Sequence, residues 1–186
     1  METSSGTQVM EATGPEGAER LLGRILPVYE TVFAEPPYGE GPRDVADFLE
    51  RFDRERRTPG FRITAADQDG LNVGFTYGYE LQSETSWWEG FVDTKPAEAF
   101  TREDGHRTFV IMELAVLPAQ RRHGLATQMH AKLLDGLQTE RVTLAVRPEA
   151  EPALTLYKNL GYSLVGHSRP WDDSPLYQVL IRPLGA

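Results

Sequence analysis

The fold is decided by one stretch of the chain, Thr108–Leu137, which reads TFVIMELAVLPAQRRHGLATQMHAKLLDGL. Its first part, Thr108–Leu117, is almost entirely apolar and lacks the alternation of a half-exposed strand. We therefore expect a strand that is buried on both faces. Pro118 marks a break. Further on, apolar residues recur every four positions and predict a helix with one apolar face. These residues are Leu125, Met129, Leu133 and Leu137.

A basic turn with one glycine, Arg121–Ala126, lies between the strand and the helix. The start of a helix leaves backbone N–H groups unpaired and carries partial positive charge, so it favours anions. Gly124 allows a ligand to approach the backbone closely, and two arginines add charge. The turn therefore predicts a pyrophosphate site. It has neither the Gly-Lys-Ser/Thr ending of a Walker loop nor the three spaced glycines of a dinucleotide fingerprint.

Two segments resemble motifs of the GNAT family of acyl-CoA N-acyltransferases. The turn resembles the family's phosphate-binding motif, Gln/Arg-x-x-Gly-x-Gly/Ala, with Arg121, Gly124 and Ala126 at its fixed positions. The preceding segment, Glu113–Pro118, looks like the strand that carries this motif. Further along, Ala153–Tyr162 resembles the family helix written Ala-x-x-Leu-Tyr-x-x-x-Gly-Phe/Tyr.

One position departs from the family pattern. An asparagine often ends the fifth strand of GNAT domains, whereas here Val146 leads into Arg147 and Pro148. The sequence therefore does not predict a side-chain contact to the cofactor at that place.

The composition is that of an acidic globular chain. Its 186 residues, 40% of them apolar, are enough for one domain with a substantial core. There are 19 basic and 28 acidic residues, a net charge of −9, which argues against nucleic acid as a partner. The absence of cysteine excludes disulfides, thiolate metal sites and cysteine nucleophiles.

The sequence predicts neither a metal site nor a segment that targets or crosses a membrane. The four histidines show no ligand spacing, so we expect no metal. The first residues do not resemble a signal peptide, and no apolar run is long enough to cross a bilayer. We therefore expect a soluble, cytoplasmic protein without a membrane partner.

Periodicity and turn residues predict the order β-α-α-β-β-β-α-β-α-β-β. This order gives a mixed, mostly antiparallel central sheet with helices on both faces, and GNAT domains show the same order. We expect a disordered tail over 1–5 and a single acyltransferase domain over 6–186. The expected strands are 7–12, 61–66, 71–81, 108–117, 141–146, 163–167 and 176–181, and the expected helices are 16–33, 43–57, 125–137 and 151–160.

Three local features of these elements stand out. Pro27 is expected to bend or interrupt the first helix. One face of the strand 71–81 carries Gly74, Thr76 and Gly78, so something bulky could lie close against it. The other face should carry Val73, Phe75, Tyr77 and Tyr79.

The segment Ser83–Arg107 is longer than a connection between two strands requires. Connections of this length are usually functional or disordered. Its aromatic residues, among them Trp87 and Trp88, argue against disorder. A lid and a subunit contact, for example in a homodimer, are the two alternatives that the sequence leaves open.

The resemblance implies attack of a neutral amine on the thioester of acetyl-CoA, the cofactor that we expect. An alkyl ammonium has a pKa of about 10 and must first lose a proton. Glu113 is the ionisable residue of the central strand and the candidate base, acting either through a water chain or by holding a deprotonated fraction of the amine in place. Its alternative role is that of an Arg-paired glutamate at a strand end. Tyr157 is the candidate donor to the leaving thiolate, and the alternative is a tyrosine that packs in the core.

The resemblance also implies which residues hold the cofactor. The turn should bind the pyrophosphate through backbone N–H groups, and the strand should pair with the pantetheine arm. These residues are Leu114, Ala115, Val116, Arg121, Arg122, His123, Gly124, Leu125, Ala126 and Thr127. The side chains of the two arginines either meet phosphate or are solvated.

Aromatic residues and carboxylates predict an acceptor pocket for an amine with apolar or ring character. The candidates are Tyr29, Glu30, Tyr38, Trp87, Trp88, Trp171 and Asp172. The sequence thus predicts an N-acyltransferase that moves an acetyl or other short acyl group from coenzyme A to a small-molecule amine, by direct transfer in a ternary complex. The alternatives are a non-catalytic acyl-CoA sensor, acetylation of a protein amine, and a nucleotide-binding protein that uses the same turn.

Overall fold

The computed structural model describes residues 6–185, so the tail expected over 1–5 lies outside the described residues. The chain forms two compact units, with boundaries that fall in two of its strands. The first unit holds the residues up to Tyr79 together with Met112–Leu137, and the second holds Glu80–Ile111 and the residues from Gln138 onward. The single domain expected over 6–186 stays a prediction.

The observed elements follow the expected order, with two short additions. The strands are β1 Gln8–Thr13, β2 Arg62–Gln68, β3 Leu71–Glu80, β4 Thr108–Val116, β5 Arg141–Val146, β6 Ser163–Ser168 and β7 Tyr177–Pro183. The helices are α1 Gly14–Phe33, α2 Pro42–Glu55, α3 Glu98–Thr101, α4 Leu125–Leu134 and α5 Glu151–Asn159, and a 3₁₀ turn spans Pro118–Gln120.

The strands form a mixed sheet in the order β1-β2-β3-β4-β5-β7-β6. β4 and β5 pair in parallel, while β1 with β2, β2 with β3, β5 with β7 and β6 with β7 pair antiparallel. The expected fold class, a mostly antiparallel mixed sheet with helices, is therefore confirmed.

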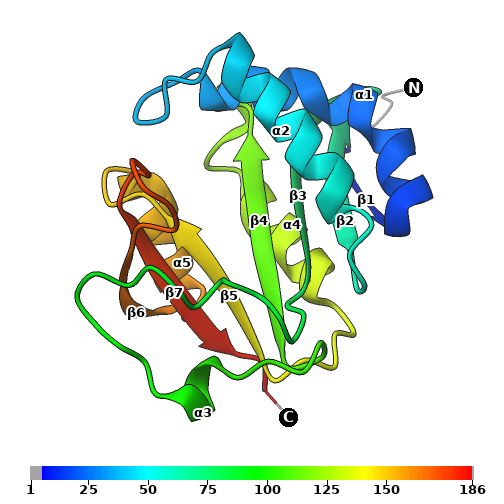
Figure 1. Ribbon diagram of the computed structural model, residues 1–186. Helices are drawn as coiled ribbons and strands as arrows, with labels where there is room; N and C mark the ends of the chain where they lie inside the picture. The colour runs from blue at the N-terminus through cyan, green and yellow to red at the C-terminus, as the bar shows by residue number, and fades with distance from the viewer. Residues whose placement is uncertain (1–5, 186) are drawn as a thin grey trace. The chain divides into compact units, whose positions relative to one another are not determined.

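Helices cover both faces of the sheet in the first unit (Figure 1). The apolar stripes of α1 and α2 pack on Phe75 and Tyr77 of β3 and form the main core. On the other face, Leu125 and Met129 of α4 pack against β2 and β3. The glycine-lined face that the sequence predicts for β3 is buried, and at Gly74 it lies against Met129 of the α4 layer.

Gly74 shows what the bare face of β3 accommodates. A Cβ atom on this residue would lie 2.9 Å from the carbonyl oxygen of Ala115 and 3.0 Å from Cε of Met129. The bulky neighbour is thus a methionine of α4. Side-chain direction was predicted correctly for Phe75 and Tyr77, but Val73 joins the α4 layer. A register shift in the β2–β3 ladder leaves Val73 without a partner residue on β2, and such bulges reorient a side chain.

The β2–β3 hairpin closes through Asp69 and Gly70. Both have positive φ angles, 52° and 82°, as a two-residue type I′ turn requires. Pro27 does not interrupt α1, which is one of the two effects expected of it. The expected end of the fourth helix needs correction: α4 ends at Leu134 instead of Leu137, because Asp135 is extended and Gly136 has φ 71°.

In the second unit, β5, β7 and β6 form an antiparallel ladder, and the long segment after β3 packs against them. Residues 89–94 run beside β6. The N–H of Val92 donates to the carbonyl of His167 at 2.9 Å, and Phe91 bridges to Ser168. Asp93 also accepts hydrogen bonds from the backbone N–H of His167 at 2.8 Å and its ring at 2.6 Å.

A buried ion pair fixes the rest of this segment. Arg141 of β5 contacts Glu103 at 2.9 Å, and the side chain of Glu103 is fully buried. The Arg141 guanidinium lies over the rings of Trp88 and Phe100, at 5.1 and 4.6 Å from their centroids. The indole of Trp88 donates to Glu103 at 2.8 Å. The aromatic residues of the segment therefore pack within their own unit.

Candidate functional site

Glu113 lies on β4 and forms an ion pair with Arg51 of α2. The distance between Arg51 Nη2 and Glu113 Oε1 is 2.6 Å, and the glutamate side chain is 11% exposed. The structure thus contains the pairing that the sequence leaves open as an alternative role. A paired carboxylate still has a second oxygen, so the pairing does not exclude proton transfer.

Four more polar residues of the first unit surround this pair. Tyr77 of β3 donates its hydroxyl to Glu55 of α2 at 2.6 Å. Tyr29 of α1 donates to Glu40, in the loop before α2, also at 2.6 Å. Three carboxylates and one arginine therefore share a region that is largely closed to water.

Burial dominates the protonation of Glu113. It raises the pKa of this carboxyl to about 7, against the lowering effect of the Arg51 charge and hydrogen bond. The carboxylates of Glu55 and Glu40 raise it further. Burial also raises the pKa of Glu55, which Arg51 again opposes. Glu113 is therefore close to half ionised near neutral pH.

The partners of Glu113 were not predicted from the sequence, although a signal exists. Phe48, Arg51, Phe52 and Glu55 recur at spacings of three and four residues, which places them on neighbouring positions of one helix face. Two charged residues that interrupt an apolar stripe indicate a buried polar contact, because isolated buried charges are costly. What α2 packs against could not be read from that pattern.

The anion turn has the expected backbone geometry. Arg122 and Gly124 both have positive φ, at 67° and 75°, and Gly124 is the N-cap of α4 without a side-chain cap hydrogen bond. The first N–H groups of a helix have no partner within it, and turns with left-handed residues gather N–H groups into an anion-binding concavity. The residues present therefore fit a pyrophosphate.

Arg121 has a role that the sequence did not predict. Its Nε donates to the carbonyl of Val116 at 3.1 Å, and its Nη2 contacts Glu35 at 2.7 Å. The side chain thus ties the turn to the end of β4 and to the loop after α1. Arg122 and His123 are exposed.

The carboxyl half of β4 differs from its start. Pairing with β5 covers Thr108, Phe109 and Val110 of the described β4 residues. On the β3 side, the hydroxyl of Thr76 donates to the carbonyl of Glu113 at 2.7 Å. The predicted cofactor residues Leu114–Val116 lie between Glu113 and the turn, with Ala115 and Val116 buried.

Tyr157 belongs to α5 of the second unit, whereas Glu113 belongs to the first. Its side chain is buried, and its ring packs edge-on against Tyr162 with centroids 5.4 Å apart. The structure therefore gives Tyr157 the packing that the sequence leaves open as its alternative.

The predicted acceptor residues fall into different surroundings. In the first unit, Tyr29 stacks on Phe48 at 3.8 Å, Tyr38 contacts Phe33 edge-on at 5.0 Å, and Glu30 is exposed. The four in the second unit occupy two settings: Trp87 and Trp88 are tied to Thr143 and Glu103, while Trp171 and Asp172 are exposed. Tyr29 is thus the predicted acceptor residue that the structure brings into electrostatic contact with Glu113.

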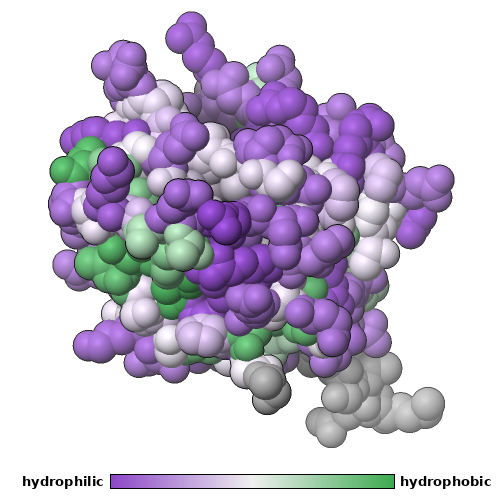
Figure 2. Space-filling model, turned by 60° about the horizontal axis from the view of Figure 1, so that its bottom comes forward, coloured by the Kyte–Doolittle hydropathy of each residue, from purple (hydrophilic) through white to green (hydrophobic). Residues whose placement is uncertain are grey.

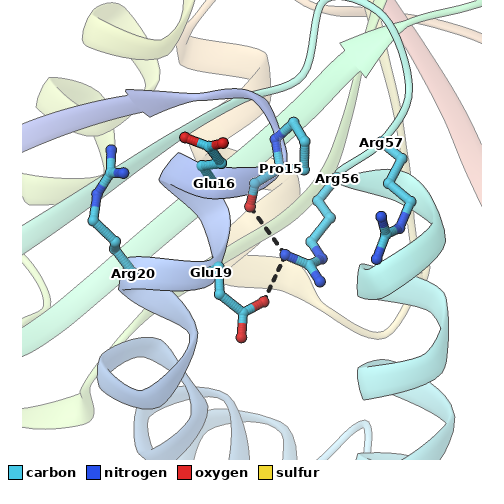
Figure 3. A pocket seen from close by; sticks show the side chains of 6 residues that line it. All are labelled: Pro15, Glu16, Glu19, Arg20, Arg56 and Arg57. Carbon is cyan, nitrogen blue, oxygen red and sulfur yellow. Dashed lines mark hydrogen bonds and ion pairs between the residues drawn. The ribbon is translucent and has the colours of Figure 1, made fainter.

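A surface hollow of about 620 Å³ lies between the start of α1 and the end of α2 (Figure 3). Its lining contains none of the predicted site residues: Pro15, Glu16, Glu19, Arg20, Arg56 and Arg57. Arg56 is held by Glu19 at 2.6 Å and by the carbonyl of Pro15 at 2.9 Å. The charge of Arg56 is thus paired with that of Glu19.

The described residues offer neither a metal site nor a membrane-spanning helix. Within residues 6–185, no group of histidine, aspartate and glutamate could hold a metal ion. Over the same range, no helix has both the length and the apolarity to cross a membrane.

The sequence model described as the acetyltransferase (GNAT) family matches residues 25–162. The match spans more than half of the 186 residues, and the chain therefore belongs to the GNAT family of acetyltransferases. Acetyl-CoA is the cosubstrate of this family. None of the curated proteins matches the chain.

Solved structures share the fold over nearly the whole chain. A protein of Pyrococcus horikoshii OT3 has a TM-score of 0.65 at 14% identity, over 96% of this chain and 100% of its own. Phosphinothricin acetyltransferase of Sinorhizobium meliloti, in complex with acetyl-CoA, has 0.64 at 17%, over 96% and 89%. The ribosomal-protein-S18-alanine N-acetyltransferase of Escherichia coli has 0.64 at 15%, over 97% and 96%. These identities are low, so the likeness concerns the fold.

Proposed function

We propose that the protein transfers an acetyl group from acetyl-CoA to the amine of a small molecule, by direct attack within a ternary complex. The observation that carries this proposal is the buried Glu113 on the strand that leads into the anion turn. Its pKa of about 7 suits a general base at neutral pH, because half of the molecules can accept a proton. A carboxyl with the ordinary pKa would be a weaker base.

Bound acetyl-CoA would supply an activated acyl thioester. The backbone N–H groups of Arg122–Thr127 would hold its pyrophosphate, and Arg121 would keep the turn attached to the end of β4. The backbone of Leu114–Val116 would pair with the pantetheine arm as an added strand.

Tyr157 would donate a hydrogen bond to the leaving sulfur. A phenol with a pKa of about 10 gives a full proton to a thiolate with a pKa of about 8.5 only at a cost of about 2 kcal/mol. Donating a hydrogen bond to the sulfur therefore costs less free energy than transferring the whole proton. The thiolate could then take a proton from solvent after release.

Tyr29 and Tyr38 would form an aromatic wall of the acceptor site, with Glu40 as a nearby carboxylate. Such a wall favours a small amine with apolar or ring character. The competing class of acceptor is a protein amine. Binding an extended protein terminus would need an open groove along the same residues.

The test is release of CoA thiol from acetyl-CoA in the presence of amines: polyamines, aminoglycosides, amino acids and short peptides. We expect turnover with at least one small amine and none without an acceptor. Glu113→Gln and Tyr157→Phe should each lower turnover while acetyl-CoA still protects against thermal unfolding. Glu140→Gln, an exposed glutamate paired with Arg107, is the matched control.

Three results would point elsewhere. Unchanged rates in both variants would contradict the catalytic assignment. Tight acetyl-CoA binding without turnover on any amine would indicate a sensor. Thermal protection by ATP or NAD, and none by CoA, would indicate a nucleotide-binding protein.

A further inference from the structure

Arg51 reaches Glu113 from a distant part of the chain and is held on two sides. Its guanidinium donates to Glu113 at 2.6 Å and lies 5.9 Å from the ring centroid of Phe48, one turn earlier on α2. The side chain is 33% exposed, so only part of it meets water. Both contacts hold the guanidinium next to the Glu113 carboxylate.

The other groups that act on Glu113 are acids and hydroxyls. Glu55 of α2 and Glu40 of the preceding loop both disfavour its ionised form. Tyr29 of α1 and Tyr77 of β3 also interact with its charge. Among the described groups that shift Glu113, Arg51 is the cation.

We propose that Arg51 is a positioning residue, which keeps Glu113 ionised and oriented for the acceptor amine. This inference rests on the proposed base role of Glu113. Because Arg51 occupies Oε1, the proton leaving the amine, directly or through a water, would be taken up by Oε2. Arg51 itself neither gives nor takes a proton, since a guanidinium stays charged at any working pH.

The first measurement does not depend on activity. Infrared difference spectra follow the protonated carboxyl band of Glu113, assigned as the band that Glu113→Gln lacks. In Arg51→Gln the midpoint of its titration should rise by about 1 to 3 pH units, the usual effect of losing an adjacent opposite charge. Arg51→Lys should shift it less, and Arg54→Gln, an exposed arginine on the same helix, should leave it unchanged.

The second measurement is the pH profile of kcat/KM. In Arg51→Gln its acid limb should move toward alkaline pH by the same amount, which at neutral pH means a loss of about fivefold or more. Circular dichroism checks that each variant is folded. If the glutamine variant unfolds, the lysine variant carries the test, because it keeps the charge but not the planar fork.

The outcomes separate the two ideas. If Glu113→Gln loses activity but Arg51→Gln leaves the infrared midpoint in place, the inference about Arg51 is overturned and the base role stands. A lysine variant with the wild-type midpoint but the low activity of Glu113→Gln would support the orienting role of the planar fork. A lysine variant with the glutamine variant's midpoint and wild-type activity would contradict the inference. If Glu113→Gln keeps wild-type rates, Glu113 is not the base. The proposed role of Arg51 in positioning a catalytic base is then contradicted as well.

Discussion

At the scale of single residues, the pKa of Glu113 is set by two opposing effects. Loss of water raises its pKa, and the arginine beside it lowers the pKa. The net effect leaves the group close to its point of half ionisation near neutral pH. Such balance makes the ionisation of Glu113 sensitive to any change in its neighbours.

The dependence of stability on pH should reveal this balance. The pKa of Glu113 is raised in the folded state from 4.5 to about 7, so it binds its proton more tightly there than in the unfolded chain. The resulting stabilisation is complete below the unfolded pKa and is lost as the pH rises through about 7. Relative to Glu113→Gln, the wild-type protein should lose about 3 kcal/mol of unfolding free energy across this range.

Urea unfolding of both proteins at a series of pH values measures this difference. A constant difference across the range would mean that Glu113 titrates equally in the folded and unfolded states. Activity is not needed for the measurement.

Gly124 and Gly136, which flank the two ends of α4, offer a matched pair of substitutions. They have similar positive φ angles, 75° and 71°, and an added Cβ would meet no protein atom closer than 3.9 Å at either position. Alanine at each should cost about 1–2 kcal/mol of stability, because L-residues are strained in this conformation. Only Gly124→Ala should also weaken acetyl-CoA binding, by about tenfold, because its Cβ would lie at the proposed phosphate cradle.

Isothermal titration with acetyl-CoA distinguishes the two variants. Equal affinities would argue that the cofactor does not approach Gly124. Weakened binding in both would mean that the loss comes from strain alone.

The sequence predicts residues well when their signal is local. Glu113 stands out as a charge in an apolar strand, and the turn residues follow a spaced motif. Arg51 and Glu40 became visible only in the structure, because their contacts with Glu113 and Tyr29 depend on how α2 and its loop pack. The bracing role of Arg121 depends on Glu35 in the same way.

At the scale of elements, β3 packs closely against both β4 and α4 at Gly74. An added Cβ would lie 2.9 Å from a backbone oxygen of Ala115, which cannot rotate away. Gly74→Ala should therefore lower the unfolding free energy by about 1–3 kcal/mol, the usual cost of overpacking. Urea unfolding measures it.

Gly23→Ala on α1 is the control for this prediction. A Cβ there meets nothing within 4 Å, and alanine favours helix by up to about 1 kcal/mol. This variant should be neutral or stabilised. Equal stability of the two variants would contradict the close packing at Gly74.

Element order was predictable because apolar periodicity and turn residues are both local properties. Errors arose where a local rule met a stronger constraint. Pro27 remains inside α1, whose buried stripe, including Ile25 and Val28, packs in the core on either side of it. The side chain of Val73 points to the α4 layer because the β2–β3 ladder shifts register there. The sequence of β3 contains no pattern that predicts this shift.

At the scale of the whole molecule, the family and fold class could be predicted from two motifs and the order of elements. The surface seen in Figure 2 is mostly hydrophilic, as the acidic composition leads one to expect. The course of the segment after β3 was not predictable, because Trp88, Phe100 and Glu103 meet Arg141 only in the folded unit.

The buried ion pair of that unit gives a further prediction. Glu103→Gln would leave the charge of Arg141 uncompensated in a closed site, at a cost of about 3–5 kcal/mol in unfolding free energy. Glu98→Gln, which removes an exposed partner of Arg102, should change stability by less than about 0.5 kcal/mol. Urea unfolding tests both, and a small effect of Glu103→Gln would show that the pair does not anchor the segment.

The course of residues 89–94 beside β6 has a consequence for solubility. β6 is an edge strand, and an open edge offers unpaired N–H and C=O groups to any other extended chain. The contacts of Val92 and Asp93 with His167 satisfy part of that edge from within the same molecule. A chain shortened by this segment would expose the edge of β6 and become prone to aggregate through strand pairing.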